Sequence, residues 1–311
     1  MKNYKALIAG IFSGFLFGFT TYFVKIFLKL MNNDVYKYLT SRYVIGFITM
    51  TLMIFFGVSK INFKNKSIRK LILIGLLTPV VSQSLEITGS VFVDMAQTNI
   101  IKCLTPVWTV VIAVAINKEK TDLKQCIFLF LTVLGVVITQ IGSLGRGSSV
   151  LGLLLTIGCT VSIAFQRGLT RRWSESYSAF EVVYIQTACG AIVFSVISIV
   201  QHIIQGNLGQ YFVGYDNPQV MFSVLFNGIV TCVFGFMLLT YSVSHQPIAI
   251  SQSVQTLQNI VGIIVGVVLL NDKLSLPDIV GVIIMFVGVF GASLCFNPQN
   301  TKQNEFSIKK I

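Results

Sequence analysis

Three ionisable side chains occur inside long apolar runs of this 311-residue sequence, where a charge is costly: Arg42, Glu86 and Lys102. Glu86 lies eight residues before Asp94, and Lys102 lies eight residues after it. If the chain turns back sharply at Asp94, both side chains reach the same depth, about 12 Å below the turn at the rise of an α-helix. Arg42 reaches a comparable depth from the same side. A carboxylate and two cations at one depth could bind an anion, exchange a proton or pair with one another.

This charged cluster has two interpretations. In the functional one, its formal charge of +1 attracts a carboxylate-bearing solute, and Glu86 takes up and releases a proton. In the structural one, Glu86 pairs with Lys102 or Arg42 and only holds helices together. An internal repeat, described below, places Leu239 and Gln255 opposite Glu86 and Lys102. The charges therefore belong to one half of the chain, and the fold by itself does not require them.

Polar side chains also recur on one face of two apolar runs. Asn99, Lys102 and Thr105 are spaced by three residues, which puts them on one side of a helix. The same offsets in the matching run of the second half give Gln252, Gln255 and Gln258, followed by Asn259. Such residues can hydrogen-bond across helices. Because the two faces occupy matching positions, we expect them to line one central cleft.

Four further side chains complete the candidate binding site. Gln83 shares a helical face with Glu86, three residues away. Three aromatic residues could wall a cavity or offer a cation–π surface, although packing alone also explains them: Tyr22, Trp108 and Tyr241. The sequence contains no Walker-A loop, HExxH pair or GxSxG elbow, and its six cysteines and two histidines show no metal-ligand spacing. We therefore expect no enzyme and no metal or cofactor.

The composition indicates a largely apolar environment. Hydrophobic residues make up 54% of the chain and charged residues 11%, and the mean hydropathy is +0.80. A soluble domain carries about 25% charged residues, so we expect the lipid bilayer to cover this surface. The net charge of +12 does not indicate nucleic-acid binding, because most Lys and Arg residues stand in short connectors between apolar runs.

Ten apolar runs have about the 20 residues that a helix needs to cross a bilayer. They are 4–28, 35–57, 68–91, 95–117, 123–141, 150–169, 179–204, 220–244, 248–271 and 276–296. The first run lacks a small-residue cleavage site, so we expect a retained helix. With the N-terminus in the cytoplasm, sixteen Lys and Arg residues fall on the inner side and six on the outer side. The positive-inside rule thus predicts two cytoplasmic termini, and the lack of a targeting segment favours the plasma membrane.

The two halves of the chain resemble each other. A slide of 153 residues aligns 75–139 with 228–292 without a gap. The matches include Gly75 with Gly228, Gly135 with Gly288, Glu119-Lys120 with Asp272-Lys273 and, at a slide of 144, Gly46 with Gly190. Each half holds five spans, an odd number, so the second half enters the membrane upside down. We predict an all-α membrane protein of two inverted five-helix repeats, 1–141 and 150–296, with a connector at 142–149 and a cytoplasmic tail at 297–311.

The ends of the two repeats carry a family resemblance. In the first half, Ala96 leads through Leu104-Thr105-Pro106 to Asn117-Lys118-Glu119-Lys120 and Gly135. In the second half, Ala249 leads through Leu257 to Asn271-Asp272-Lys273, Gly281 and Gly288. With these residues the chain resembles the drug/metabolite transporter superfamily, in its ten-helix EamA-type branch. The resemblance covers nearly the whole chain and implies membrane transport, with amino acids, sugars, lipids and other metabolites as the range of substrates.

These features favour a secondary transporter that works by alternating access. Its expected substrate is a small polar metabolite, such as an amino acid or another carboxylate-bearing solute, bound between the halves. Transport without a nucleotide site implies uniport, exchange or coupling to a proton or another ion. The alternative is a non-transporting membrane protein, such as a lipid-handling enzyme or a membrane sensor. Because ten helices can complete a cavity within one chain, we expect a monomer or a homodimer.

Overall fold

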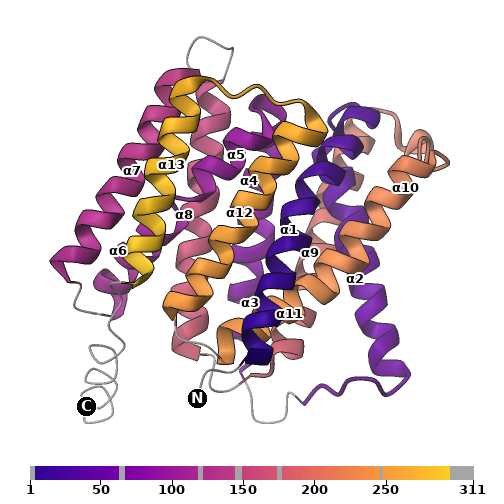
Figure 1. Ribbon diagram of the computed structural model, residues 1–311. Coiled ribbons are helices and arrows are strands. Elements are labelled where there is room, and N and C mark those ends of the chain that lie inside the picture. The colour runs from indigo at the N-terminus through magenta and orange to yellow at the C-terminus, as the bar shows by residue number, and fades with distance from the viewer. Residues whose placement is uncertain are drawn as a thin grey trace.

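The computed structural model describes residues 4–62, 67–117, 122–143, 149–173, 177–245 and 248–294. The regular elements in these ranges are all helices, and the long ones run side by side through a single bundle (Figure 1). The predicted cytoplasmic tail, 297–311, and most of the predicted connector lie outside the described residues.

Ten helical units, counted over the described ranges, cross the bundle, and three of them are assembled from shorter helices. The continuous units are α1 (Tyr4–Leu30), α2 (Val35–Phe55), α7 (Leu123–Ser143), α8 (Val150–Trp173), α9 (Ala179–Ile204), α12 (Ile248–Leu270) and α13 (Leu276–Leu294). The third unit consists of α3 (Ile68–Gly75), the π-helical η1 (Leu76–Val81) and α4 (Ser82–Phe92). The fourth consists of α5 (Met95–Lys102) and α6 (Thr105–Asn117), and the eighth of α10 (Pro218–Leu225), the π-helical η4 (Phe226–Gly235) and α11 (Phe236–His245). A 3₁₀ turn, η3 (Leu208–Gln210), lies between α9 and α10.

The outward faces of these helices are apolar, as a bilayer requires. Large apolar side chains that stay more than half exposed include Phe12, Phe130, Ile192 and Val268. Seven units in the described ranges are long and apolar enough to span a membrane by themselves, and the last two add shorter apolar stretches. Since water would penalise so much exposed apolar surface, the chain is a multi-pass membrane protein.

The fourth predicted span, 95–117, is not one continuous helix. It breaks at Cys103 and Leu104, between α5 and α6. Pro106 has no N–H with which to bond the carbonyl of Lys102, and the Thr105 hydroxyl donates to that carbonyl instead, at 2.6 Å. The matching residue of the second half is Asn259, which keeps its N–H, and α12 runs through without a break. The fourth predicted span is therefore present over its predicted length, and it is interrupted just before Pro106.

The third and eighth units widen at matching places. The slide of 153 carries residues 76–81 of η1 onto 229–234, which lie inside η4. In η1 the backbone of Thr78 leaves helical geometry, with φ −138° and ψ 115°, next to Pro79. Because π-helical turns are rare and often occur at functional sites, their coincidence supports the repeat and marks the region that leads into α4.

The two halves cross through glycines that the repeat relates. A Cβ atom on Gly135 of α7 would lie 2.5 Å from the backbone nitrogen of Met285 in α13. A Cβ atom on Gly288 of α13 would lie 2.5 Å from the backbone nitrogen of Thr132 in α7. The slide of 153 carries Gly135 onto Gly288 and Thr132 onto Met285, so it exchanges the two contacts. Such an exchange is the signature of two-fold symmetry between the halves.

Helices α2 and α9 cross in the same two-fold manner. The rings of Tyr43 and Phe194 pack with centroids 5.5 Å apart, and Thr187 Oγ1 lies 3.6 Å from Met50 Sδ. The slide of 144 exchanges these contacts too, because it carries Tyr43 onto Thr187 and Met50 onto Phe194. The protein is thus an all-α membrane protein of ten spanning units in two inverted five-helix repeats, as predicted.

Candidate functional site

A chain of polar contacts joins α2, α4 and α5 inside the first half. Arg42 Nη1 donates to Gln83 Oε1 at 3.0 Å, and Gln83 Nε2 donates to Glu86 Oε2 at 2.9 Å. Lys102 Nζ forms a salt bridge with Glu86 Oε1 at 2.7 Å, and these two side chains are only 11% and 16% exposed. We call these four residues the Arg42 cluster. All four were predicted as site residues, and the structure brings them together.

The local sequence explains how α4 and α5 present their side chains to each other. Helix α4 ends at Phe92 and α5 begins at Met95, so the chain reverses at Val93 and Asp94. This reversal brings Glu86 and Lys102 to the same depth, as their equal spacing predicted. Gln83 precedes Glu86 by three residues, which puts both side chains on one face of α4.

The depth of Arg42 is set by the start of α2. The Asp34 carboxylate caps this helix by accepting a hydrogen bond from the backbone N–H of Lys37 at 3.0 Å. The same carboxylate lies 3.2 Å from His202 Nε2 at the end of α9, and Lys37 Nζ donates to the Val213 carbonyl at 3.2 Å. The start of α2 is thereby tied to the connection between α9 and α10, which keeps Arg42 at the level of Gln83.

Arg42 carries the least compensated charge of the cluster. Its side chain is 2% exposed, and its hydrogen-bond acceptor is the neutral amide of Gln83, while Glu86 is engaged by Lys102. The Arg42 Cζ atom lies 5.6 Å from the centre of the Tyr43 ring, in a cation–π contact. Its Nε atom has no hydrogen-bond partner within the described residues. A buried guanidinium with a spare donor is suited to bind both oxygens of a carboxylate.

The predicted polar stripes face each other where α5 meets α12. The Asn99 side chain packs against Gly262 of α12, so closely that a Cβ atom there would lie 2.6 Å from it. From the other helix, Asn259 Nδ2 donates to Cys103 Sγ of α5 at 3.3 Å. In this conformation the two asparagines thus contact the opposite helix. Their lining of a central cleft stays a prediction.

The other predicted residues lie outside the Arg42 cluster. Thr105 is buried and uses its hydroxyl to bond the Lys102 carbonyl. Trp108 has a buried indole N–H without a partner among the described residues, Tyr22 packs on Phe23, and Tyr241 packs on His245. Gln258 is partly buried, and the side chains of Gln252 and Gln255 lie outside the described part of the chain. No hydrogen bond or ring contact between described residues joins Tyr22, Trp108 or Tyr241 to the cluster.

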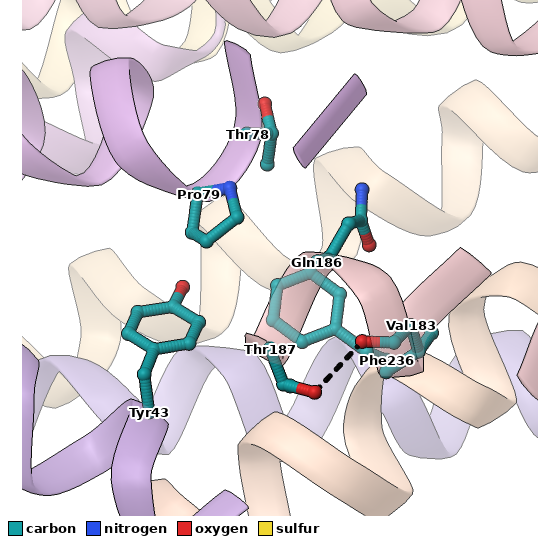
Figure 2. A pocket seen from close by; sticks show the side chains of 7 residues that line it. All are labelled: Tyr43, Thr78, Pro79, Val183, Gln186, Thr187 and Phe236. Atoms are coloured by element: carbon teal, nitrogen blue, oxygen red, sulfur yellow. Dashed lines mark hydrogen bonds between the residues drawn. The ribbon is translucent and has the colours of Figure 1, made fainter. Parts of the chain in front are cut away.

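A small hollow opens beside Tyr43, and Figure 2 shows the side chains around it. The space that the centre of a water molecule can occupy is about 10 Å³, which is room for roughly one water molecule. Both halves supply its walls, which include Tyr43 of α2, Thr78 and Pro79 of η1, Gln186 and Thr187 of α9, and Phe236 of α11. We call this space the Tyr43 hollow.

The Tyr43 hollow is the repeat counterpart of the place where Arg42 meets Gln83. The slide of 144 carries Arg42 onto Gln186, and the slide of 153 carries Gln83 onto Phe236. The matched residues of the second half therefore both line the hollow. Tyr43 and Gln186 were not among the residues that the sequence analysis singled out. The signal was present, because the slide that matched Gly46 with Gly190 also matched Arg42 with Gln186.

Comparison with known proteins identifies the architecture. The model of the EamA-like transporter family matches residues 4–141 and again residues 150–294. The chain belongs to the EamA-like transporter family. The "Uncharacterized transporter YcxC" of Bacillus subtilis (strain 168) is 27% identical over 307 residues, which cover 98% of this chain and 97% of that protein. A crystal structure of another protein, 13% identical, shares the fold with a TM-score of 0.65 over 94% of this chain and 99% of its own.

This EamA-like protein is therefore a membrane transporter with one family repeat in each half. The Arg42 cluster lies in the first repeat, and Gln186 lies in the second. Tyr43 contacts residues of both. The Tyr43 hollow thus lies at the boundary between the repeats, next to the cluster of the first repeat.

Proposed function

We propose that this EamA-like protein is a secondary transporter that moves a small carboxylate-bearing metabolite across the plasma membrane by alternating access. The observation that carries the proposal is the buried guanidinium of Arg42, which has an amide and no carboxylate as its hydrogen-bond acceptor.

The energetics of Arg42 support an anionic substrate. A buried cation without an anionic partner is costly, and one that meets a carboxylate in the right geometry regains much of that cost. An arginine fork can bind the two oxygens of a carboxylate at once, and such charge-assisted bonds are about twice as strong as neutral ones. An arriving carboxylate would displace the Gln83 amide, which is the weaker acceptor. The site therefore has a reason to prefer an acid over its neutral analogue.

Contacts between the halves support alternating access. Asp272, which follows α12, accepts a hydrogen bond from the backbone N–H of Ala96 at 2.9 Å. This bond joins the second half to the first turn of α5, at the end of the bundle that the Lys and Arg distribution assigns to the outside. We propose that it breaks when the site opens outward, while both termini remain in the cytoplasm.

The Arg42 cluster also suggests how a proton could be coupled to transport. Protonation of Glu86 would remove the negative charge that balances Lys102. The cluster would then carry two positive charges and hold an anion more strongly. A proton and a carboxylate would thus bind together and cross together, with little net charge moved through the membrane.

The proposal is tested with purified protein in proteoliposomes. Counterflow of labelled solutes from a metabolite mixture identifies what moves, and we expect carboxylates among them. Arg42→Gln should lower carboxylate uptake by about tenfold to a hundredfold, the range for a lost charged hydrogen bond. Arg42→Lys keeps the positive charge but loses the two parallel donors of the guanidinium. Its carboxylate uptake should lie between that of the wild type and that of Arg42→Gln. Thr51→Val is the matched control, because the Thr51 hydroxyl bonds its own helix on an exposed face of α2.

Two results would contradict the proposal. Folded protein that moves no solute of the mixture would mean that this chain does not transport small metabolites. If Arg42→Gln takes up carboxylates as fast as the control variant Thr51→Val, then another site binds the substrate. Size-exclusion profiles of each variant show whether the protein is folded.

A further inference from the structure

Both ring nitrogens of His202 face an oxygen that accepts hydrogen bonds. Nδ1 lies 2.9 Å from the backbone carbonyl oxygen of Ser198, one turn earlier in α9. Nε2 lies 3.2 Å from Oδ2 of Asp34, the residue that caps α2. A neutral imidazole carries a proton on one nitrogen only, so one of the two contacts would bring two lone pairs together. A doubly protonated ring donates to both oxygens.

The helix ends at this place favour the charged forms of both side chains. Oδ1 of Asp34 accepts a hydrogen bond from the backbone N–H of Lys37, and the positive end of the α2 dipole favours a negative charge there. His202 lies in the last turn of α9, where the negative end of the dipole favours a cation. A carboxylate and an imidazolium are therefore placed next to each other.

The pair has little contact with water. The side chain of His202 is 6% exposed and that of Asp34 is 15% exposed. The ring of Tyr211 packs on the imidazole with centroids 4.8 Å apart, and the Tyr211 hydroxyl shares a hydrogen bond with Ser198 Oγ at 3.1 Å. Each charge therefore depends on the other for compensation.

Two further charged groups stand on the segments that pack against His202, which are the first turn of α2 and the connector 205–217: Lys37 and Asp216. The Lys37 ammonium donates to a backbone carbonyl of the connector and lies over two tyrosine rings. Asp216 makes no ion pair with another described residue. Tyrosine hydroxyls titrate near pH 10, well above the range in which histidine changes its charge. Among the described residues, Asp34 is thus the carboxylate that pairs with His202.

The opposite end of the α2–α9 pair is held by a different kind of contact. The slide of 144 carries Lys37 onto Glu181, in the first turn of α9. Glu181 Oε1 accepts a hydrogen bond from the backbone N–H of Asn62, in the connection after α2, at 3.0 Å. The start of each helix is thus tied to the connection that follows the other helix. Of these two ties, the one at Asp34 includes a histidine, the residue type that titrates near neutral pH.

We propose that His202 and Asp34 form a pH-sensitive latch, in which a doubly protonated His202 fastens α9 to α2 and loss of one ring proton loosens the contact. The latch joins the second repeat to the first, at the end of the bundle that the Lys and Arg distribution assigns to the outside. Histidine changes its charge near pH 6.5, so acid on that side strengthens the latch and alkali weakens it. This inference does not depend on which solute the protein carries.

The protonation of His202 can be observed directly, because the chain contains two histidines. His245 is the internal control. Its Nδ1 also lies 2.9 Å from the carbonyl oxygen four residues earlier, and it makes no ion pair with a described residue. NMR spectra of purified protein with isotope-labelled histidine report which ring nitrogens carry a proton, and the spectrum of His245→Gln assigns the two rings.

We expect His202 to keep both ring protons at a pH at which His245 has lost one. Asp34→Asn removes the negative charge and keeps a side-chain oxygen that can cap α2. In this variant the two histidines should lose the proton over the same range of pH.

The effect on the fold is tested by melting curves. A proton that is bound more firmly in the folded chain stabilises the fold below about pH 6.5, and this stabilisation is lost as the pH rises and the ring releases the proton. The melting temperature of the wild type should therefore fall by a few degrees relative to His202→Gln as the pH rises from about 6 to about 8. His245→Gln should follow the wild type.

Two results would overturn the latch. A single ring proton on His202 in folded protein at about pH 6, below the ordinary value for histidine, would show that one of the two contacts is not a hydrogen bond. Parallel melting curves of the wild type and His202→Gln would show that the proton does not hold α9 to α2. If His202→Gln does not fold, Asp34→Asn gives the same comparison, because it removes the charge that holds the proton.

Discussion

Lys102 and Glu86 form a 2.7 Å salt bridge across the chain reversal between α4 and α5. The repeat places Gln255 and Leu239 at the matching positions, so this pair is not part of the architecture that the two halves share. Through Gln83, the same carboxylate is also linked to Arg42. The cluster therefore holds two cations and one carboxylate, and that carboxylate pairs directly with Lys102.

Glu86→Gln should destabilise the protein more than Lys102→Gln. The first change leaves two buried cations without a carboxylate, which costs about 3 kcal/mol or more. The second leaves Glu86 with Arg42 nearby, so the cluster stays close to neutral and the loss should be smaller. Melting curves in detergent measure both, and the double variant should be more stable than Glu86→Gln alone. Equal losses in the two single variants would show that Arg42 and Lys102 do not share one counter-charge.

Glu86→Gln should also remove the response of flux to an imposed pH gradient, because the coupling proposed above needs a group that titrates at this place. Uptake into proteoliposomes with and without a proton gradient measures this response. Glu86→Asp keeps a titratable carboxyl and should retain part of it. An unchanged response in Glu86→Gln would exclude Glu86 as the proton carrier.

Gly135→Ala and Gly288→Ala should destabilise the protein by similar amounts, about 1–3 kcal/mol each. Either Cβ atom would come within 2.5 Å of a backbone nitrogen on the facing helix, and backbone cannot move aside as a side chain can. Gly209→Ala is the control, since a Cβ atom at Gly209 meets nothing within 4 Å. The melting temperatures of the three variants test the two-fold crossing of α7 and α13. A large effect at one of the paired glycines alone would argue against equivalent contacts.

Asp272 should make the stability of the folded protein depend on pH. It lies between α12 and α13, where burial raises the pKa of its carboxyl, and the backbone N–H of Ala96 opposes this shift in part. A raised pKa in the folded state means that ionisation of Asp272 disfavours folding. The stabilisation of the folded state by protonated Asp272 is therefore fully present below the pKa that the carboxyl has in the unfolded chain, about 3.9. This stabilisation is lost as the pH rises through the higher pKa of the folded protein.

Asp272→Asn removes that titration and keeps an oxygen that can accept from Ala96. Melting temperatures of the wild type and the variant should therefore differ by an amount that changes as the pH rises from about 4 to neutral. In this interval the wild type should lose stability relative to the variant. Parallel curves would show that the Asp272 carboxyl has the same pKa in the folded and unfolded chain.

The contact between Glu86 and Lys102 could be predicted from the sequence because it is nearly local. Both residues lie eight positions from Asp94, and a reversal there is enough to bring them together. The partner of Arg42 could not be predicted in this way. Gln83 is 41 residues away on another helix, and the rotation of α2 about its axis decides which side chain Arg42 meets. The break before Thr105 comes from one missing N–H at Pro106, and the length of the apolar run around it does not show whether the helix is interrupted there.

The sequence alone determined the spans, the two repeats and their inversion. These follow from the length and number of apolar runs and from residue spacing, and both can be read directly along the linear sequence. The tertiary structure decided that Asn99 and Asn259 contact opposite helices and that Gln186 lines a hollow where its counterpart Arg42 binds Gln83. Those outcomes depend on how distant helices cross and rotate against one another. Packing sets these angles through many weak contacts at once, and no single segment of the sequence contains them.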